Sequence, residues 1–187
     1  EPKISKALAR KIWLKCGGYL VLDQTEALTV IDVNTGKYVG GSNLEDTVLK
    51  TNLEAAKEIA KQLRLRDIGG IIIIDFIDMR EPQHQQQVLD TLKQALKRDR
   101  TKTTVVGMTG LGLIEMTRKK IRQGLSSVML SDCPYCDGIG KILSPESIAR
   151  NVEKEINRYF TQTIANAIQV EVHPSVAVIL TGADGQR

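Results

Sequence analysis

The stretch GGIIIIDFID, residues 69–78, decides the fold. Its four consecutive isoleucines show no alternation of apolar and polar residues, so we expect both faces of this segment to be covered, as in a central strand between helices. The strand ends on Asp75, and in open α/β sheets ligands bind just beyond the carboxyl ends of the strands. Asp75 is therefore expected where chemistry is usually done.

A second apolar strand, residues 27–31, also runs into an acid, Asp32, and Asn34 follows two residues later. Between the two strands, apolar residues recur at three- and four-residue spacing up to Gly69, which predicts a long helix. A strand, a helix and a strand form a right-handed crossover unit with parallel strands. Asp32 and Asp75 are then expected side by side at one edge of the sheet.

The segments around this unit extend the sheet. Residues 19–22 and 27–32 predict a β-hairpin, and Pro82 opens a helix that faces the sheet. Residues 103–108 predict another strand, which implies a further crossover. A helix beginning near Leu111 is expected next, and it carries Arg118 among several basic residues. Residues 1–15 fit either a short helix or an extended segment.

The C-terminal part of the chain predicts a second, smaller unit. The segment CPYCDGIG, residues 133–140, is rich in turn formers and reads as a linker. Ser144 and Pro145 then open a helix, and apolar residues alternate with polar ones over 168–172 as in a half-exposed strand. The fold class is therefore α/β: a mixed sheet with crossover helices, a linker and a small α/β domain.

Composition and charge limit the partners of the chain. With 187 residues and 42% hydrophobic content it can bury a core, and its 26 basic against 22 acidic residues give a net charge of +4. This mild basic excess is compatible with a polyanionic partner. Aromatic residues make up only 4%, with one tryptophan, so we expect phosphate contacts rather than base stacking to dominate any nucleic-acid binding.

The sequence favours a cytoplasmic protein. Its longest apolar run is far shorter than the roughly 20 residues of a membrane span, and no signal-peptide pattern opens the chain. Three cysteines argue against a disulfide framework. The first residue is Glu1 rather than Met, so we expect a piece of a longer protein.

Two carboxylates at one sheet edge, with Asn34 beside them, suit a hard divalent cation. Mg²⁺ takes oxygen ligands and often needs only one or two protein carboxylates plus substrate phosphates. Asp78 and Glu115 are further candidates at the same edge. The alternative is structural, because an aspartate at a strand end is also common as a helix cap or a salt-bridge partner.

The pair Cys133 and Cys136 is half of a zinc-ribbon ligand set, since a tight turn aims both thiolates at one ion and leaves two coordination sites open. The chain has no other such pair, so a closed site needs a second copy of the chain. This predicts a dimer linked by Zn²⁺. The alternative is a redox pair, although no helix is expected after Cys133 to lower its pKa.

Five motifs in this order resemble the ribonuclease E/G family. They are TEALTVIDVNTG at 25–36, TNLEAA at 51–56, QLRLRD at 62–67, IDFIDM at 74–79 and CPxC at 133–136. The resemblance implies an endoribonuclease. It also implies that residues 1–16 lead into a DNase I-like catalytic subdomain at 17–130, with a zinc-link at 131–142 and a truncated dimerisation or tetramerisation domain at 143–187.

By position, the resemblance makes Asp32 and Asp75 ligands of a catalytic Mg²⁺, with Asn34 orienting the site. It makes Cys133 and Cys136 ligands of a Zn²⁺ shared between two subunits. Candidates for RNA contact complete the assignment: Lys37, Arg100, Lys102 and Arg118. Of these, Lys102 falls near a family position implicated in RNA contact, while a solvated basic surface is the other interpretation of Arg118.

The resemblance, together with the paired acids, implies the catalytic core of a magnesium-dependent endoribonuclease that cleaves single-stranded RNA in RNA processing and decay. The family's N-terminal RNA-binding regions have no counterpart in this sequence. The alternative is a zinc-linked RNA-binding or oligomerisation module that has little activity without those regions.

Overall fold

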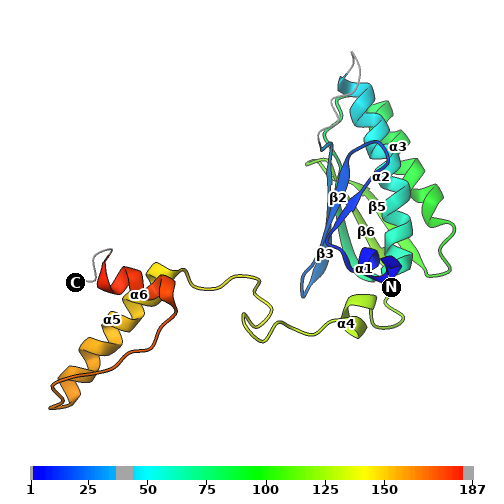
Figure 1. The fold of residues 1–187 in the computed structure, drawn as a ribbon. Coiled ribbons are helices and arrows are strands. Elements are labelled where there is room, and N and C mark those ends of the chain that lie inside the picture. Colours follow the sequence, from blue (N-terminus) through cyan, green and yellow to red (C-terminus); the bar gives the residue numbers. More distant parts are fainter. Residues whose placement is uncertain (1, 37–43, 183–187) are drawn as a thin grey trace. The chain divides into compact units, whose positions relative to one another are not determined.

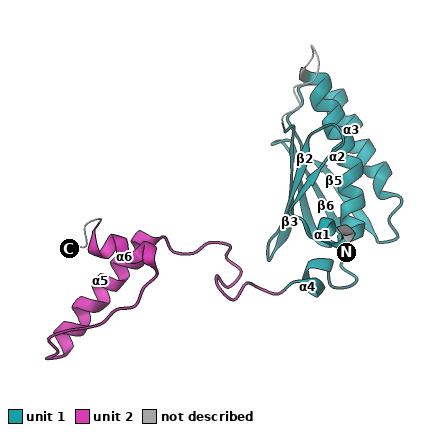
Figure 2. Ribbon diagram, viewed as in Figure 1, with its two compact units in different colours: residues 1–130 teal, residues 131–187 magenta. Residues whose placement is uncertain are grey.

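The computed structural model describes residues 2–36 and 44–182. The chain divides into two compact units, unit 1 (residues 1–130) and unit 2 (residues 131–187), as Figure 2 shows. Unit 1 contains the sheet and the acidic candidates, and unit 2 contains the cysteine pair.

Unit 1 is built on a six-stranded mixed sheet with the strand order β1-β2-β3-β4-β6-β5 (Figure 1). The strands are β1 (Lys11–Trp13), β2 (Tyr19–Gln24), β3 (Leu28–Asn34), β4 (Gly70–Asp75), β5 (Thr103–Met108) and β6 (Leu113–Arg118). Among these strands β3 and β4 are the parallel neighbours, and the other adjacent pairs are antiparallel. The predicted β2–β3 hairpin and the predicted parallel pair are confirmed.

Two long helices cover one face of this sheet. Helix α2 (Leu44–Arg66) joins β3 to β4, and helix α3 (Pro82–Leu96) joins β4 to β5. Both lie on the same side of the strands (Figure 1). The buried side chains of the helices and strands form one core, which includes Leu20, Ile31, Ala56, Ile59, Leu63, Ile72, Ile74, Val88, Leu92 and Ile114. Burying each large aliphatic side chain contributes about 1.5–3 kcal/mol.

The expectation that both faces of residues 71–74 are covered is wrong. Ile72 and Ile74 are 0% exposed beneath the helices, whereas Ile71 on the opposite face is 51% exposed. The chain moves in the same direction across the sheet from β3 to β4 and from β4 to β5. Two right-handed crossovers in one direction place their helices on the same face. The other face, called the open face below, is free of helices within the described part of unit 1.

The helix expected from Leu111 onward is also wrong, because residues 113–118 form strand β6. Ile114, Met116 and Arg118 are buried, and the residues between them are exposed, which is the period of a strand. Gly112, with φ 82°, lies in the turn that leads from β5 into β6. The apolar residues 111, 114 and 116 suggested a helix because so short a segment fits both periods.

The N-terminal residues, which fitted a helix or an extended segment, contain both. Helix α1 (Pro2–Leu8) precedes strand β1, and β1 pairs with β2 at the edge of the sheet. The segment before residue 17 therefore contributes a strand to unit 1.

Unit 1 ends with the short helix α4 (Leu125–Met129), and unit 2 contains helices α5 (Pro145–Gln162) and α6 (Pro174–Thr181). The predicted start of α5 is confirmed, since the Ser144 hydroxyl accepts a hydrogen bond from the backbone N–H of Ser147 at 3.3 Å. The strand expected at residues 168–172 is wrong. Ile168 and Val170 instead line a groove along α5, and an isolated strand without a ladder partner is unstable.

Candidate metal centre

Asp32 and Asp75 lie next to each other on the open face. The parallel register of β3 and β4 makes the two residues direct Cα partners. Both side chains alternate with the buried residues Ile31, Val33 and Ile74, so they point away from the helices. The juxtaposition predicted from the two strand ends is present in the structure.

Asn34 is linked to this pair by a hydrogen bond. Its Nδ2 donates to Oδ2 of Asp32 at 2.7 Å. Asn34 and Asp32 are two residues apart on one strand and share the open face. The amide therefore holds the Asp32 carboxylate in one orientation and leaves its other oxygen available to a ligand.

The acids at this edge repel one another. Burial, and then the negative charges of Asp32 and Asp78, raise the pKa of Asp75 above its ordinary value. Within residues 2–36 and 44–182, neither Asp32 nor Asp75 forms an ion pair with a basic side chain. A bound cation would relieve this repulsion and favour the charged form of both carboxylates.

The two further acidic candidates differ in their placement. Asp78 follows β4 closely enough to raise the pKa of Asp75. Glu115 belongs to the neighbouring strand β6 and pairs with Ile73 of β4, which lies two residues before Asp75. The Glu115 side chain is exposed on the open face. Within the described part of the chain, no three acidic, histidine or cysteine side chains come close enough to form a complete metal site. Two carboxylates with oxygen donors nevertheless match Mg²⁺, which fills its remaining positions with water and phosphate.

The loop after Asp75 is held by a residue that the sequence patterns did not single out for the site. Asn52 of α2 is 0% exposed. The nitrogen and the oxygen of its side-chain amide both form hydrogen bonds with the backbone of Ile77. Its Nδ2 donates to the Ile77 carbonyl at 2.8 Å, and its Oδ1 accepts from the Ile77 N–H at 3.2 Å. The available signal was a polar residue in an otherwise apolar helical stripe. Asn52 thereby fixes the segment between Asp75 and Asp78.

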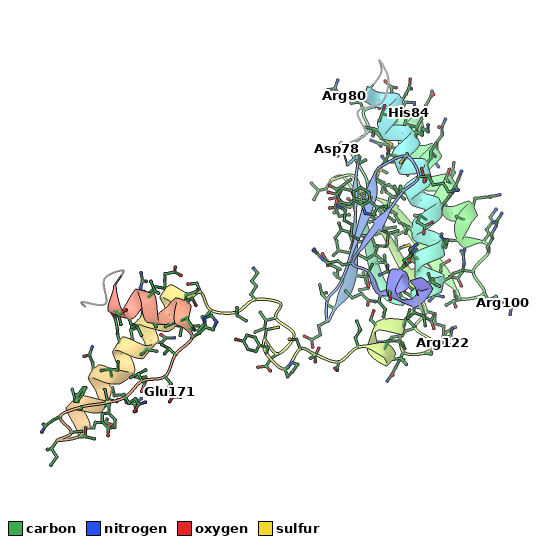
Figure 3. The ribbon with its side chains drawn as sticks, viewed as in Figure 1. Asp78, Arg80, His84, Arg100, Arg122 and Glu171 are labelled. Atoms are coloured by element: carbon green, nitrogen blue, oxygen red, sulfur yellow. The ribbon has the colours of Figure 1, made fainter. Side chains whose placement is uncertain are left out.

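The basic candidates do not join the acid pair. Lys37 lies outside the described residues. Arg100 and Lys102 precede β5. The first residue of β5, Thr103, pairs with Arg118 of β6, and Arg118 also pairs with Gly70 of β4. This row of paired residues lies five residues from Asp75 along β4, or roughly 16 Å at about 3.3 Å per residue. Figure 3 shows Arg100 at the opposite end of unit 1 from Asp78.

The assignment of Arg118 to RNA contact is wrong, because its side chain is only 4% exposed. Its guanidinium donates to Asp99 at 2.8 Å and to Asp67 at 2.9 Å, and also to the Ile68 carbonyl. Hydrogen bonds from Arg118 and from the exposed Arg122 lower the pKa of Asp67. Arg118 therefore forms a buried ion-pair network that joins the end of α2 to β6.

The cysteine pair of unit 2 lies in a tight turn. The Cys136 N–H donates to the Cys133 carbonyl at 3.3 Å, and the Gly140 N–H donates to the Cys136 sulfur at 3.3 Å. Backbone N–H groups of Tyr135 and Cys136 lower the pKa of the Cys133 thiol. Both cysteines are free, and Cys133 is exposed. A thiolate stabilised by N–H groups suits a soft metal such as Zn²⁺, and these two ligands supply half of a tetrahedral site.

The fold and this edge define an α/β protein with paired carboxylates near the carboxyl ends of two parallel strands. The chain matches the Ribonuclease E/G family over residues 1–121. It belongs to that family, because the match covers more than half of the chain.

Comparison with individual relatives extends the similarity to nearly the whole chain. It is 48% identical to "Ribonuclease G" of Escherichia coli over 184 residues, which cover 98% of this chain and 38% of the relative. It is 47% identical to "Ribonuclease G" of Haemophilus influenzae over 180 residues, 96% of this chain and 37% of the relative. Identity to "Ribonuclease E" of Escherichia coli is 39% over 199 residues, 100% of this chain and 19% of the relative. The chain thus spans well under half of the length of these relatives.

Proposed function

We propose that this chain is the catalytic core of a magnesium-dependent endoribonuclease that cleaves single-stranded RNA. The observation that carries the proposal is the direct pairing of Asp32 with Asp75 across parallel strands, with Asn34 bonded to Asp32. The names of the relatives, ribonuclease G and ribonuclease E, support RNA as the substrate.

Asp32 and Asp75 are the residues that would hold Mg²⁺. When bound, such an ion polarises a phosphoryl oxygen and lowers the pKa of a coordinated water, which is the chemistry that phosphodiester hydrolysis needs. The protein's own contribution is to fix the ligands before substrate arrives. Asn34 restrains the Asp32 carboxylate, and Asn52 restrains the loop beyond Asp75, so little reorganisation is required in the reaction.

A circular single-stranded RNA tests the proposal, because only an endonuclease can open it. We expect cleavage in Mg²⁺, none in EDTA, and slower cleavage of a duplex of the same sequence. Binding of the same RNA in EDTA is measured by anisotropy. A protein that binds the circle with or without Mg²⁺ but never opens it would contradict the proposal and favour the RNA-binding or oligomerisation module.

The proposed assembly is a homodimer in which Cys133 and Cys136 of two chains share one Zn²⁺, with a homotetramer as the larger possible assembly. The exposure of Cys133 and the N–H groups around both sulfurs support this assignment. We expect about one Zn²⁺ per two chains, and loss of the metal with a shift toward monomer in Cys133→Ser. Metal analysis with light scattering checks both, and Cys16→Ser is the matched control. One Zn²⁺ per monomer would overturn the shared site.

The proposed setting is RNA processing and decay in the cytoplasm. Within residues 2–36 and 44–182, none of the helices combines the length and apolar character that crossing a membrane requires. Cell fractionation with an antibody against this chain would test the cytoplasmic prediction.

A further inference from the structure

Two aromatic rings and an ammonium group gather at the β1 edge of the open face. Trp13 is 64% exposed, and its ring centroid lies 5.3 Å from that of Tyr19 at an interplanar angle of 60°. Lys11 Nζ lies 4.4 Å from the Trp13 centroid and 3.5 Å from the Tyr19 centroid. Contacts of this length are cation–π interactions, so the three side chains hold each other in place.

Strand register ties this cluster to the acid pair. Trp13 pairs with Tyr19, and Tyr19 pairs with Asn34, the residue bonded to Asp32. These pairs share the open face, because the residues between them along the strands are the buried ones. Adjacent strands are about 4.8 Å apart, so β1 lies roughly 10 Å from the strand that carries Asp32. A nucleotide next to one held at the acids could reach the rings.

We propose that Trp13, Tyr19 and Lys11 form a stacking subsite for a nucleobase of single-stranded RNA beside the scissile phosphate. The inference rests on the proposed function, since it takes the phosphate to be held at Asp32 and Asp75. The exposed face of the Trp13 indole stacks on the base, and Tyr19 supports the indole from the side. Lys11 supplies a positive charge where the nearby carboxylates would otherwise repel the RNA backbone.

The chemistry of the cluster favours a base over other ligands. Stacking on an aromatic ring accepts any base, because every base has a π-face, and arginine or lysine beside the ring adds cation–π attraction. A large indole left mostly in water on a three-residue edge strand buries little apolar surface, so packing alone gives a weak reason for a tryptophan there.

Trp13 is the single tryptophan of the chain, so its fluorescence reports on this site alone. A short single-stranded RNA is titrated in EDTA, where no cleavage is expected, and binding is followed in parallel by anisotropy of a labelled end. We expect quenching that saturates together with the anisotropy. An abasic oligonucleotide and inorganic polyphosphate should give little quenching. Equal quenching by polyphosphate, or full binding without quenching, would overturn the subsite.

Substitutions test whether an aromatic ring at position 13 is needed for RNA binding. Trp13→Ala is expected to weaken RNA binding by roughly 5- to 150-fold, the range found for loss of one base–aromatic stack. Trp13→Phe should retain most of the affinity because it keeps an aromatic face. Val106→Ala, which removes another exposed apolar side chain from the opposite edge strand, is the matched control and should bind like wild type. Wild-type affinity in Trp13→Ala would contradict the proposal.

The outcome is distinguishable from a failure of the proposed function. Asp75→Asn is expected to lose cleavage while retaining base-dependent quenching, because Asp75 lies outside the aromatic cluster. If wild type shows quenching but no cleavage, the nuclease proposal fails; Trp13 then binds a base, but its place beside a scissile phosphate is overturned. If wild type cleaves RNA and Trp13→Ala cleaves with unchanged KM, the nuclease proposal stands and the subsite fails.

Discussion

The two ends of the sheet in unit 1 differ in how their charged side chains are paired. Near the carboxyl ends of β3 and β4, Asp32 and Asp75 lie side by side on the open face without a basic partner among the described residues. At the other end, Arg118 is buried between Asp67 and Asp99 with its charge balanced. The balanced end holds the fold together. The acidic end leaves a repulsion between carboxylates in place, which a bound cation would relieve.

The largest effect is expected at the balanced end. Arg118→Ala should lower the free energy of unfolding by about 3–5 kcal/mol, because Asp99, whose side chain is 4% exposed, is left buried without its partner. Arg122→Ala is the matched control. Arg122 bonds Asp67 from a 78% exposed position, so its loss should cost less than about 1 kcal/mol. Urea unfolding of the three proteins checks the difference.

This comparison would break if Arg118→Ala abolished RNA cleavage while unfolding at the same urea concentration as wild type. Arg118 would then act on the reaction rather than on stability.

The next effect is expected at the acidic end and concerns cleavage rather than folding. Asp75→Asn keeps the shape of the side chain but removes one charge, so single-turnover cleavage of RNA should fall at least about a hundredfold, or about 2.7 kcal/mol. Asp90→Asn, which changes an exposed acid of helix α3, is the control and should cleave like wild type. A Mg²⁺ titration with unfolding curves alongside is the measurement. Near wild-type cleavage by Asp75→Asn would leave the aspartate a structural role.

A smaller effect tests the support of the acidic end. Asn52→Ala removes both hydrogen bonds to the backbone of Ile77 and leaves a buried N–H and C=O without partners, which costs about 1–3 kcal/mol. Cleavage should fall as well, because the loop between Asp75 and Asp78 loses its anchor. Lys57→Ala, at an exposed position of the same helix, should change stability by less than about 0.5 kcal/mol. Equal unfolding curves for the two variants would rule out the anchoring role.

The smallest effect is the opposite sign of pH dependence at the two ends. The pKa of Asp67 is lowered by Arg118 and Arg122, so its contribution to stability is full above its unfolded pKa and is lost as the pH falls through its folded pKa. The pKa of Asp75 is raised, chiefly by burial, so its unfavourable contribution is full above its folded pKa and disappears as the pH falls toward its unfolded value of about 3.9.

Unfolding in EDTA from about pH 7 to pH 3 checks these signs. Compared with wild type, Asp75→Asn should be slightly more stable at pH 7 and equal near pH 3. Asp67→Asn should be less stable at pH 7, with a difference that narrows as the pH falls below the unfolded pKa and vanishes only below the lowered folded pKa. If wild type were instead more stable than Asp75→Asn at pH 7, the Asp75 carboxylate would have a favourable interaction partner.

Local patterns in the sequence were sufficient for the two strands that carry the acid pair and for the helix between them. The strand that ends on Asp75, the apolar periodicity of α2 and the crossover rule together predicted that Asp32 and Asp75 would meet, and the β3–β4 register confirms it. The roles of these residues in metal binding and cleavage remain predictions. The same patterns failed at β6, where six residues are too few to separate a strand from a helix turn.

The sequence by itself determined strands β3 and β4 and the helix α2 between them, and that two carboxylates lie near the ends of neighbouring parallel strands. Only the tertiary structure decided that both long helices cover one face, that Arg118 is buried between two aspartates, and that Trp13 lies exposed near Asn34. Periodicity is a local property of the chain. Burial and side-chain partners depend on strand order and crossover handedness, which join residues that the sequence keeps far apart.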